Sequence, residues 1–190
     1  MISAEDARST VLRRCEDSAP GERFAIQSCD LSPRGDYWVV CCNSEDYVVH
    51  GMLDRCYVGV SAHLVSVSSG DVETVGSAQS WMEYLQDTYD LSAAAGAHYV
   101  IEPTFDRTDK AALINLRQKL SCSIPDAIAM LAPGRRQWLT GNRRLLQRTQ
   151  EILRDKGIDT VVVLHPTPLA AATIDERSWY WDAVASLLRP

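Results

Sequence analysis

The sequence predicts an α+β protein in two parts: an N-terminal helix, an antiparallel sheet and a helix, then a helix-rich module that ends in a C-terminal helix. Short segments rich in β-branched and aromatic residues, separated by turn residues, predict the sheet of the first part. Apolar residues at helical spacing predict the helices of the second part. One pattern replaces the other near Pro103 and Thr104, so we expect domains at residues 1–103 and 104–190.

Charge is distributed unevenly over the two parts. Residues 1–104 contain 16 acids and six arginines, a net charge of −10, whereas residues 105–190 contain nine acids and 13 basic residues, a net charge of +4. A division of this kind indicates two modules with different surfaces. An acidic module attracts basic partners and repels nucleic acid and anionic membranes.

The first part is expected to begin with a helix. Ser3 can cap this helix, and Glu5 and Asp6 suit the positive end of its dipole. Two arginines follow at the other end, and a segment containing proline and glycine then interrupts the helical pattern. The helix is therefore expected over residues 3–14.

The sheet of the first part is expected to consist of short strands. Apart from the hairpin described next, β segments are expected at residues 23–29, 37–42, 46–49 and 57–60. The clearest hairpin joins residues 63–67 to residues 72–76, because apolar and polar residues alternate on both sides of a glycine-containing turn. A helix capped by Ser80 is expected at residues 81–91.

The second part is expected to be mainly helical. Its helices are predicted at residues 110–120, 123–131 and 143–156. The second of these has Ser123 as its cap, Pro125 in its first turn and Asp126 at the third helical position. A β-branched strand is expected at residues 159–164. The last helix has one apolar face, made of Trp181, Val184, Ala185 and Leu188.

Composition favours a protein that is neither secreted nor embedded in a membrane. The longest apolar runs, such as residues 160–164, are far shorter than the roughly 20 residues that cross a bilayer as a helix. The first six residues do not resemble a signal peptide, so we expect a cytoplasmic location. The six cysteines contain no C-x-x-C pair, and we expect reduced thiols rather than disulfides or a zinc site.

The sequence contains no motif that identifies catalysis. None of the four histidines lies four residues from another, as a helical zinc-protease motif requires, and no glycine-rich phosphate loop is present. We therefore expect no catalytic residues, no metal and no cofactor, and interpret the chain as a non-enzyme. The arginines of residues 135–154 surround Trp138, but acids lie in the same segment, so we expect a solvated helix face rather than a nucleic-acid site.

Residues 2–91 resemble the YrhB-like family, also called immunity protein 35, which accompanies bacterial polymorphic toxins. The resemblance rests on the early helix, the aromatic strand at residues 37–41 and the hairpin at residues 64–78, which ends in Gly76-Ser77-Ala78. A helix containing Glu83-Tyr84-Leu85 follows the hairpin, as in that family. The resemblance implies a protein that neutralises a toxin by binding it.

Residues 99–163 are similar to the C-terminal domain of the ribosomal stalk protein. The segment at residues 116–127 matches its helix–turn–helix, and residues 145–163 match its last helix, glycine turn and strand. The resemblance implies a compact β-α-α-β-α-β module. The stalk domain binds translation GTPases through lysines, but the matching positions hold Asp109, Ile114, Pro125 and Ile128.

The leading hypothesis is therefore an immunity protein whose acidic surface covers the functional site of a toxin, and that site is expected to be basic. Complementary charge would speed the encounter, and a few buried anchors would hold the complex. The candidate contacts are acids expected in loops or at strand ends: Asp36, Glu45, Asp46, Asp54, Asp71 and Glu73. The alternatives are a chaperone-like holdase and a translation-associated factor that acts through the second part.

Overall fold

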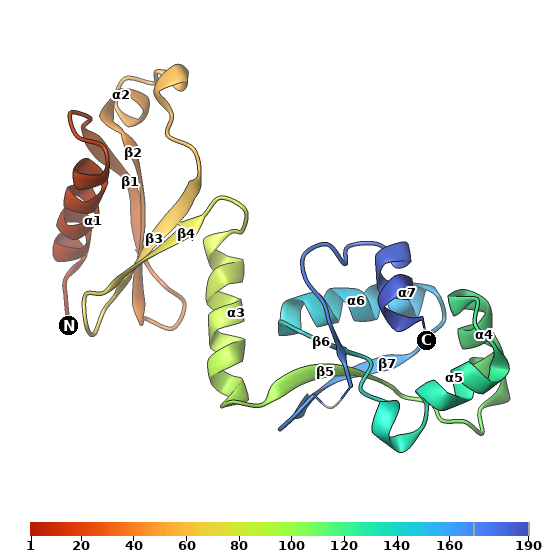
Figure 1. Cartoon of the computed structure of the whole chain (residues 1–190). Coiled ribbons are helices and arrows are strands. Elements are labelled where there is room, and N and C mark those ends of the chain that lie inside the picture. The colour runs from red at the N-terminus through yellow and green to blue at the C-terminus, as the bar shows by residue number, and fades with distance from the viewer. Residues whose placement is uncertain (169, 190) are drawn as a thin grey trace. The chain divides into compact units, whose positions relative to one another are not determined.

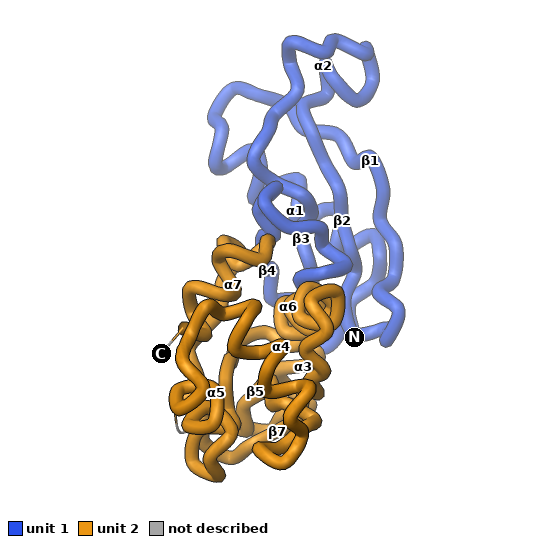
Figure 2. The backbone as a smooth tube through the Cα atoms, turned by 90° about the vertical axis from the view of Figure 1, so that its right-hand side faces the viewer, with its two compact units in different colours: residues 1–86 blue, residues 87–190 orange. Residues whose placement is uncertain are grey.

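The structure is a computed structural model that describes residues 1–168 and 170–189, and it divides into two compact units, residues 1–86 and 87–190 (Figure 2). Among the described residues, helices combine with two four-stranded sheets, which confirms the α+β class. The division comes earlier in the chain than the predicted boundary at residue 103. Residues 98–103 form a strand that pairs with two strands of the second unit, and this pairing assigns them to that unit.

The first unit is an antiparallel meander with a helix across one face (Figure 1). Its elements are α1 (Ala4–Ser18), β1 (Phe24–Leu31), β2 (Tyr37–Ser44), α2 (Glu45–Val48), a short 3-10 turn (Leu53–Arg55), β3 (Val60–Ser66), β4 (Val72–Gly76) and the start of α3 (Trp81–Ala94). The strands lie in the order β1-β2-β3-β4. The expected hairpin of β3 and β4 is confirmed, and so is the cap of α1, where Ser3 and Asp6 form a capping box.

The core of the first unit lies between α1 and one face of the sheet. Ala7, Val11 and Cys15 recur along α1 at four-residue spacing and pack with Val40 of β2 and Val65 of β3. Since side chains alternate along a strand, every second residue of β2 and β3 faces α1. This geometry decides which side chains of the sheet can meet those of α1.

Two of the expected β segments are wrong. Residues 45–48 form α2, because the hydroxyl of Ser44 accepts a hydrogen bond from the Tyr47 amide and two acids stand in the first turn. Capping of this kind outweighs the β preference of Tyr47 and Val48. Of residues 57–60, only Val60 belongs to a strand, because the backbone of Tyr57 bonds to a side chain instead of a neighbouring strand.

The second unit follows the predicted order β-α-α-β-α-β. Its elements are β5 (His98–Pro103), α4 (Lys110–Leu120), α5 (Ile124–Met130), a 3-10 turn (Pro133–Arg135), β6 (Leu139–Thr140), α6 (Arg143–Asp155), β7 (Thr160–His165), β8 (Ala172–Thr173) and α7 (Trp181–Leu188). The strand order is β7-β5-β6-β8, with only β6 and β8 parallel. The expected caps of α5 are confirmed, as is the apolar face of α7, where Val184, Ala185 and Leu188 are buried.

Among the described residues, no helix combines the length and apolar character that crossing a lipid bilayer requires.

A close approach of backbone to side chain makes Gly141 sensitive to substitution. A Cβ atom at this position would lie 2.9 Å from Cγ1 of Ile174 and 3.1 Å from the Ile174 carbonyl oxygen. Gly141→Ala is therefore expected to lower the free energy of unfolding by about 1–3 kcal/mol, as overpacking does. Urea unfolding of the full chain measures this loss. Gly134→Ala is the control, because a Cβ there meets no atom within 4 Å; equal losses for the two variants would contradict the clash.

Candidate functional site

The six acids proposed from the sequence do not form one surface. Asp36 and Asp71 lie in the turns at one end of the sheet, where the Asp36 carbonyl accepts from the Val67 amide and the Asp71 carbonyl from the Ser66 amide. Glu45, Asp46 and Asp54 lie at the opposite end, on α2 and the 3-10 turn (Figure 1). Glu73 lies on β4 between the two ends.

Three of these carboxylates hold local structure. Asp36 accepts a hydrogen bond from the hydroxyl of Ser32 at 2.7 Å, and Asp71 accepts one from Ser69 at 2.6 Å. Glu73 accepts a hydrogen bond of 2.9 Å from the hydroxyl of Tyr84, which ties the start of α3 to β4, and raises the pKa of that phenol. The contacts of these three acids within the chain give each of them a structural role, so their presence does not require a binding protein.

The segment of residues 45–60, which joins β2 to β3, exposes large apolar side chains. Leu53 is 79% exposed and Val58 is 88% exposed. The exposed set of this segment is Val49, Met52, Leu53, Tyr57, Val58 and Val60. Single exposed apolar residues are ordinary, but a concentration of them in one short segment is typical of a protein-binding surface.

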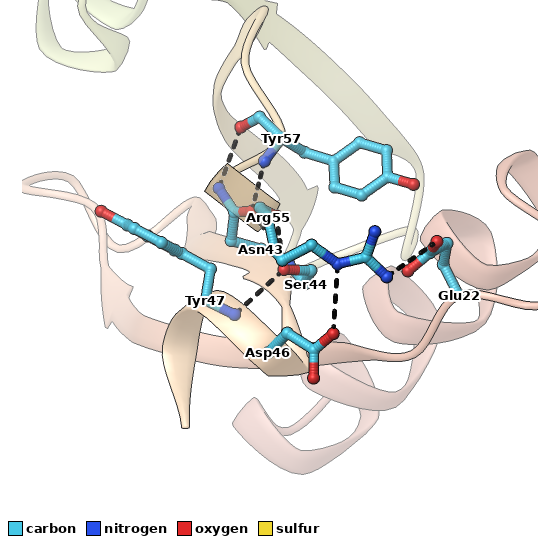
Figure 3. Close-up of polar contacts among 7 residues, drawn as sticks. All are labelled: Glu22, Asn43, Ser44, Asp46, Tyr47, Arg55 and Tyr57. Atoms are coloured by element: carbon cyan, nitrogen blue, oxygen red, sulfur yellow. Dashed lines mark hydrogen bonds and ion pairs between the residues drawn. The ribbon is translucent and has the colours of Figure 1, made fainter. Parts of the chain in front are cut away.

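The backbone of this segment is held by two buried side chains at the end of β2 (Figure 3). The amide group of Asn43 donates to the Tyr57 carbonyl at 2.9 Å, and its oxygen accepts from the Tyr57 amide at 2.8 Å. The hydroxyl of Ser44 donates to the Arg55 carbonyl at 2.7 Å and accepts from the Tyr47 amide at 3.1 Å. Asn43 and Ser44 thus replace strand pairing, and the segment has a defined conformation although it lacks a partner strand.

Charged side chains surround the same segment. Arg55 forms ion pairs with Asp46 at 3.3 Å and with Glu22 at 3.8 Å, and Glu45 lies 3.7 Å from Arg23. The hydrogen bond to Asp46, followed by the charge of Glu22, raises the pKa of the Arg55 guanidinium. Such exposed pairs contribute little to stability. With Asp54, and with Arg14, which lines a pocket together with Tyr57 and Val58, four carboxylates stand against three guanidiniums, so the charge around the apolar segment is negative by one unit.

A second cluster, of thiol and imidazole groups, lies between α1 and the sheet of the first unit. Cys15 of α1 has its sulfur 3.2 Å from the sulfur of Cys42 on β2 and 3.5 Å from Nε2 of His63 on β3. The other ring nitrogen of His63 lies 3.1 Å from the hydroxyl of Thr74 on β4. We name Cys15, Cys42 and His63 the thiol–imidazole cluster.

The thiol–imidazole cluster lines a pocket of about 400 Å³. The rest of the lining consists of Arg14, Ser18, Ala19, Phe24, Tyr57, Val58, Val60 and Thr74. Burial raises the pKa of the Cys42 thiol, and the bond to Cys15 adds to that shift. Burial, with a smaller contribution from the charge of Arg14, lowers the pKa of His63. A protonated Cys42 thiol and a neutral His63 imidazole are therefore favoured at neutral pH, and Cys42 lacks the low pKa of a cysteine nucleophile.

No sequence motif connects the members of this cluster. Residues 15, 42 and 63 stand 27 and 21 positions apart, far outside the spacing of the usual zinc motifs. The alternation of side chains along β2 and β3 places positions 42 and 63 on the α1 face, but only the pairing register brings them together.

Three arginines of the basic stretch, Arg143, Arg144 and Arg148, have contacts within the second unit. Arg144 forms an ion pair with Asp87 at 3.1 Å, and Arg143 forms one with Asp90 at 3.3 Å. Arg148 lies over the ring of Trp179, 3.9 Å from its centroid. These contacts give structural roles to side chains that could otherwise indicate an RNA-binding surface.

No protein-family model, curated protein or solved structure matches the chain. The resemblances to the YrhB-like family and to the ribosomal stalk domain stay predictions.

Proposed function

We propose that this chain is a non-enzymatic binding protein that presents residues 45–60 to another protein, and that this partner is a bacterial toxin with a basic functional site. The observation that carries the proposal is the exposure of six large apolar side chains on a segment whose backbone is held by Asn43 and Ser44. A surface of this kind binds with little loss of conformational entropy, because the segment is already ordered.

The chemistry of the segment selects the kind of partner. Leu53, Tyr57 and Val58 are suited to fill apolar hollows, and burying apolar surface contributes about 25 cal/mol per Å². Acids at 45, 46 and 54 would face a basic rim on the partner, which speeds association and rejects acidic proteins. A toxin that acts on nucleic acid has such a basic site, and covering that site would neutralise the toxin.

The test is co-expression with the toxin domain that this proposal expects the adjacent upstream gene to encode. The wild-type chain is expected to restore growth, and Leu53→Asp and Val58→Asp are expected to weaken the complex by about 30-fold or more, as loss of a binding hot spot does. Both side chains are exposed, so neither substitution disturbs the core. Leu91→Asp is the matched control, because Leu91 is an exposed leucine of α3 in the second unit.

A kinetic measurement separates the role of charge. Neutralising Glu45 and Asp54 together, as Glu45→Gln and Asp54→Asn, is expected to slow association at low salt and to leave dissociation nearly unchanged. Asp71→Asn, at the other end of the sheet, is expected to leave both rates unchanged.

Normal growth rescue by both Leu53→Asp and Val58→Asp would refute the proposal. A wild-type chain that does not bind the toxin domain would refute it as well.

A further inference from the structure

We propose that Cys15, Cys42 and His63 form a zinc site with a fourth coordination position that faces the adjoining pocket. The sulfur atoms of the two cysteines and one ring nitrogen of the histidine all lie within 4.8 Å of one another. Two thiolates and one imidazole, with an exchangeable fourth ligand, are an established zinc ligand set. The three proposed ligands are not among the residues proposed to bind a toxin, and zinc binding does not depend on toxin binding, although Tyr57 and Val58 both line this pocket and belong to the proposed toxin surface.

One separation of the ligand atoms matches that of a tetrahedral ion, and a second needs a small adjustment. With Zn–S of about 2.3 Å and Zn–N of about 2.0–2.1 Å, tetrahedral angles place sulfur and nitrogen about 3.5 Å apart and the two sulfurs about 3.8 Å apart. The sulfur of Cys15 is already 3.5 Å from Nε2 of His63. The sulfurs of Cys15 and Cys42, 3.2 Å apart, would separate by roughly half an ångström.

A neighbouring hydroxyl already orients the histidine. Nε2 of His63 faces Cys15, while Nδ1 lies 3.1 Å from the hydroxyl of Thr74. Histidines that bind metals almost always use their second ring nitrogen in this way, which sets the tautomer and the ring orientation. Nε2 already faces the Cys15 sulfur at 3.5 Å, so it is the ring nitrogen placed to serve as the ligand atom.

Charge balance favours a divalent ion at this buried position. Cys15 and His63 are buried, and uncompensated charge is costly in such surroundings. On coordination each thiol releases its proton to solvent, so two thiolates, one neutral imidazole and Zn²⁺ form a complex without net charge. The ion would join α1, β2 and β3, which contribute one ligand each.

The pocket supplies room for the fourth ligand. Phe24, Tyr57 and Val58 contribute apolar wall, and Arg14 is a cation of the same lining. An anion or a water molecule on the metal would therefore lie in a pocket with one positive side chain. The chemical class that we assign to the fourth position is a small anion or water.

The test uses the full chain, reduced and freed of metal with a chelator. Titration with Zn²⁺ against a chromophoric chelator is expected to show one ion per chain. Co²⁺ in its place is expected to give a thiolate-to-metal charge-transfer band and the visible spectrum of a tetrahedral site, and added azide is expected to shift that spectrum. No binding by the reduced chain would overturn the proposal, and no response to azide would overturn the open fourth position.

Variants locate the ion. Cys15→Ser, Cys42→Ser and His63→Gln are each expected to lower Zn²⁺ affinity more than about 100-fold, beyond the range seen for second-sphere changes. Cys41→Ser is the matched control. Successive side chains of β2 point to opposite faces of the sheet, so the Cys41 thiol lies on the face away from α1, where it is near the Ser61 carbonyl. Thr74→Val keeps all three ligands and is expected to lower affinity about 10- to 100-fold, so it remains informative if a ligand variant does not fold. Unchanged affinity in Thr74→Val and in the folded ligand variants would overturn the site.

Discussion

Asn43→Ala is expected to lower the free energy of unfolding by about 2–4 kcal/mol and to disorder residues 45–60. The side chain of Asn43 bonds to both the amide and the carbonyl of Tyr57 and also accepts from the Ser44 amide at 2.9 Å. Alanine leaves these backbone groups without their partners, and each unpaired buried group costs about 1–3 kcal/mol. The loss is expected to be smaller than the sum because the released segment reaches water.

Urea unfolding measures the stability change, and amide hydrogen exchange locates it. Exchange in Asn43→Ala is expected to rise at the amides of Ser44 and Tyr57, while the second unit keeps the exchange rates of the wild type. Tyr57→Phe is the control, because both bonds use the Tyr57 backbone and neither uses its hydroxyl (Figure 3). Wild-type exchange at Tyr57 in the alanine variant would show that Asn43 does not hold the segment.

The same variant connects conformation to binding. If order in residues 45–60 lowers the entropic cost of binding, Asn43→Ala weakens toxin binding although the exposed apolar side chains are unchanged. Leu53→Asp has the opposite profile, with wild-type stability and weakened binding. The pair therefore separates the contribution of pre-organisation from that of apolar contact.

Leu146→Ala is expected to lower the free energy of unfolding by about 2–5 kcal/mol. Leu146 of α6 is completely buried in the core of the second unit, together with Leu116 of α4 and Leu153 of α6. Truncation removes the favourable transfer of the side chain from water and leaves a cavity that the neighbouring helices fill only partly. The loss would be the largest expected from any single change discussed for the second unit.

Urea unfolding of the full chain measures the effect, and hydrogen exchange assigns it to residues 87–190. Leu91→Ala makes the same chemical change at a leucine that is 73% exposed, and it is expected to have little effect. A loss no larger in Leu146→Ala than in Leu91→Ala would show that α6 does not pack as described.

Local chemistry made many elements of this chain predictable. The capping boxes of Ser3 with Asp6 and of Ser123 with Asp126 need only residues three apart, so the sequence reveals them. The same rule explains why the β segment expected at residues 46–49 is a helix at 45–48: the cap at Ser44 outweighs the β preference of Tyr47 and Val48. A capping signal was present there, and strand propensity was the weaker guide.

The candidate sites were less accessible to sequence reasoning. An acid in a loop has the same sequence signature whether it binds a partner or holds a turn, so the contacts of Asp36 and Asp71 with serine hydroxyls could not be foreseen. The exposure of Leu53 and Val58 could not be foreseen either, since apolar residues usually lie inside. Only the folded chain shows that six large apolar side chains of one segment are exposed together.

The sequence by itself determined the α+β class, the helices of the second unit and the apolar face of α7, because these depend on periodicity and on neighbours a few residues apart. The β-α-α-β-α-β order of the second unit is what the resemblance to the ribosomal stalk domain implies, and periodicity predicts neither of the two-residue strands β6 and β8. Only the tertiary structure decided that Asp36, Asp71 and Glu73 lie away from the three acids of the apolar segment, and that Cys15, Cys42 and His63 meet. Those relations depend on strand register and on the packing of α1 against the sheet, which bring together residues that no local pattern connects.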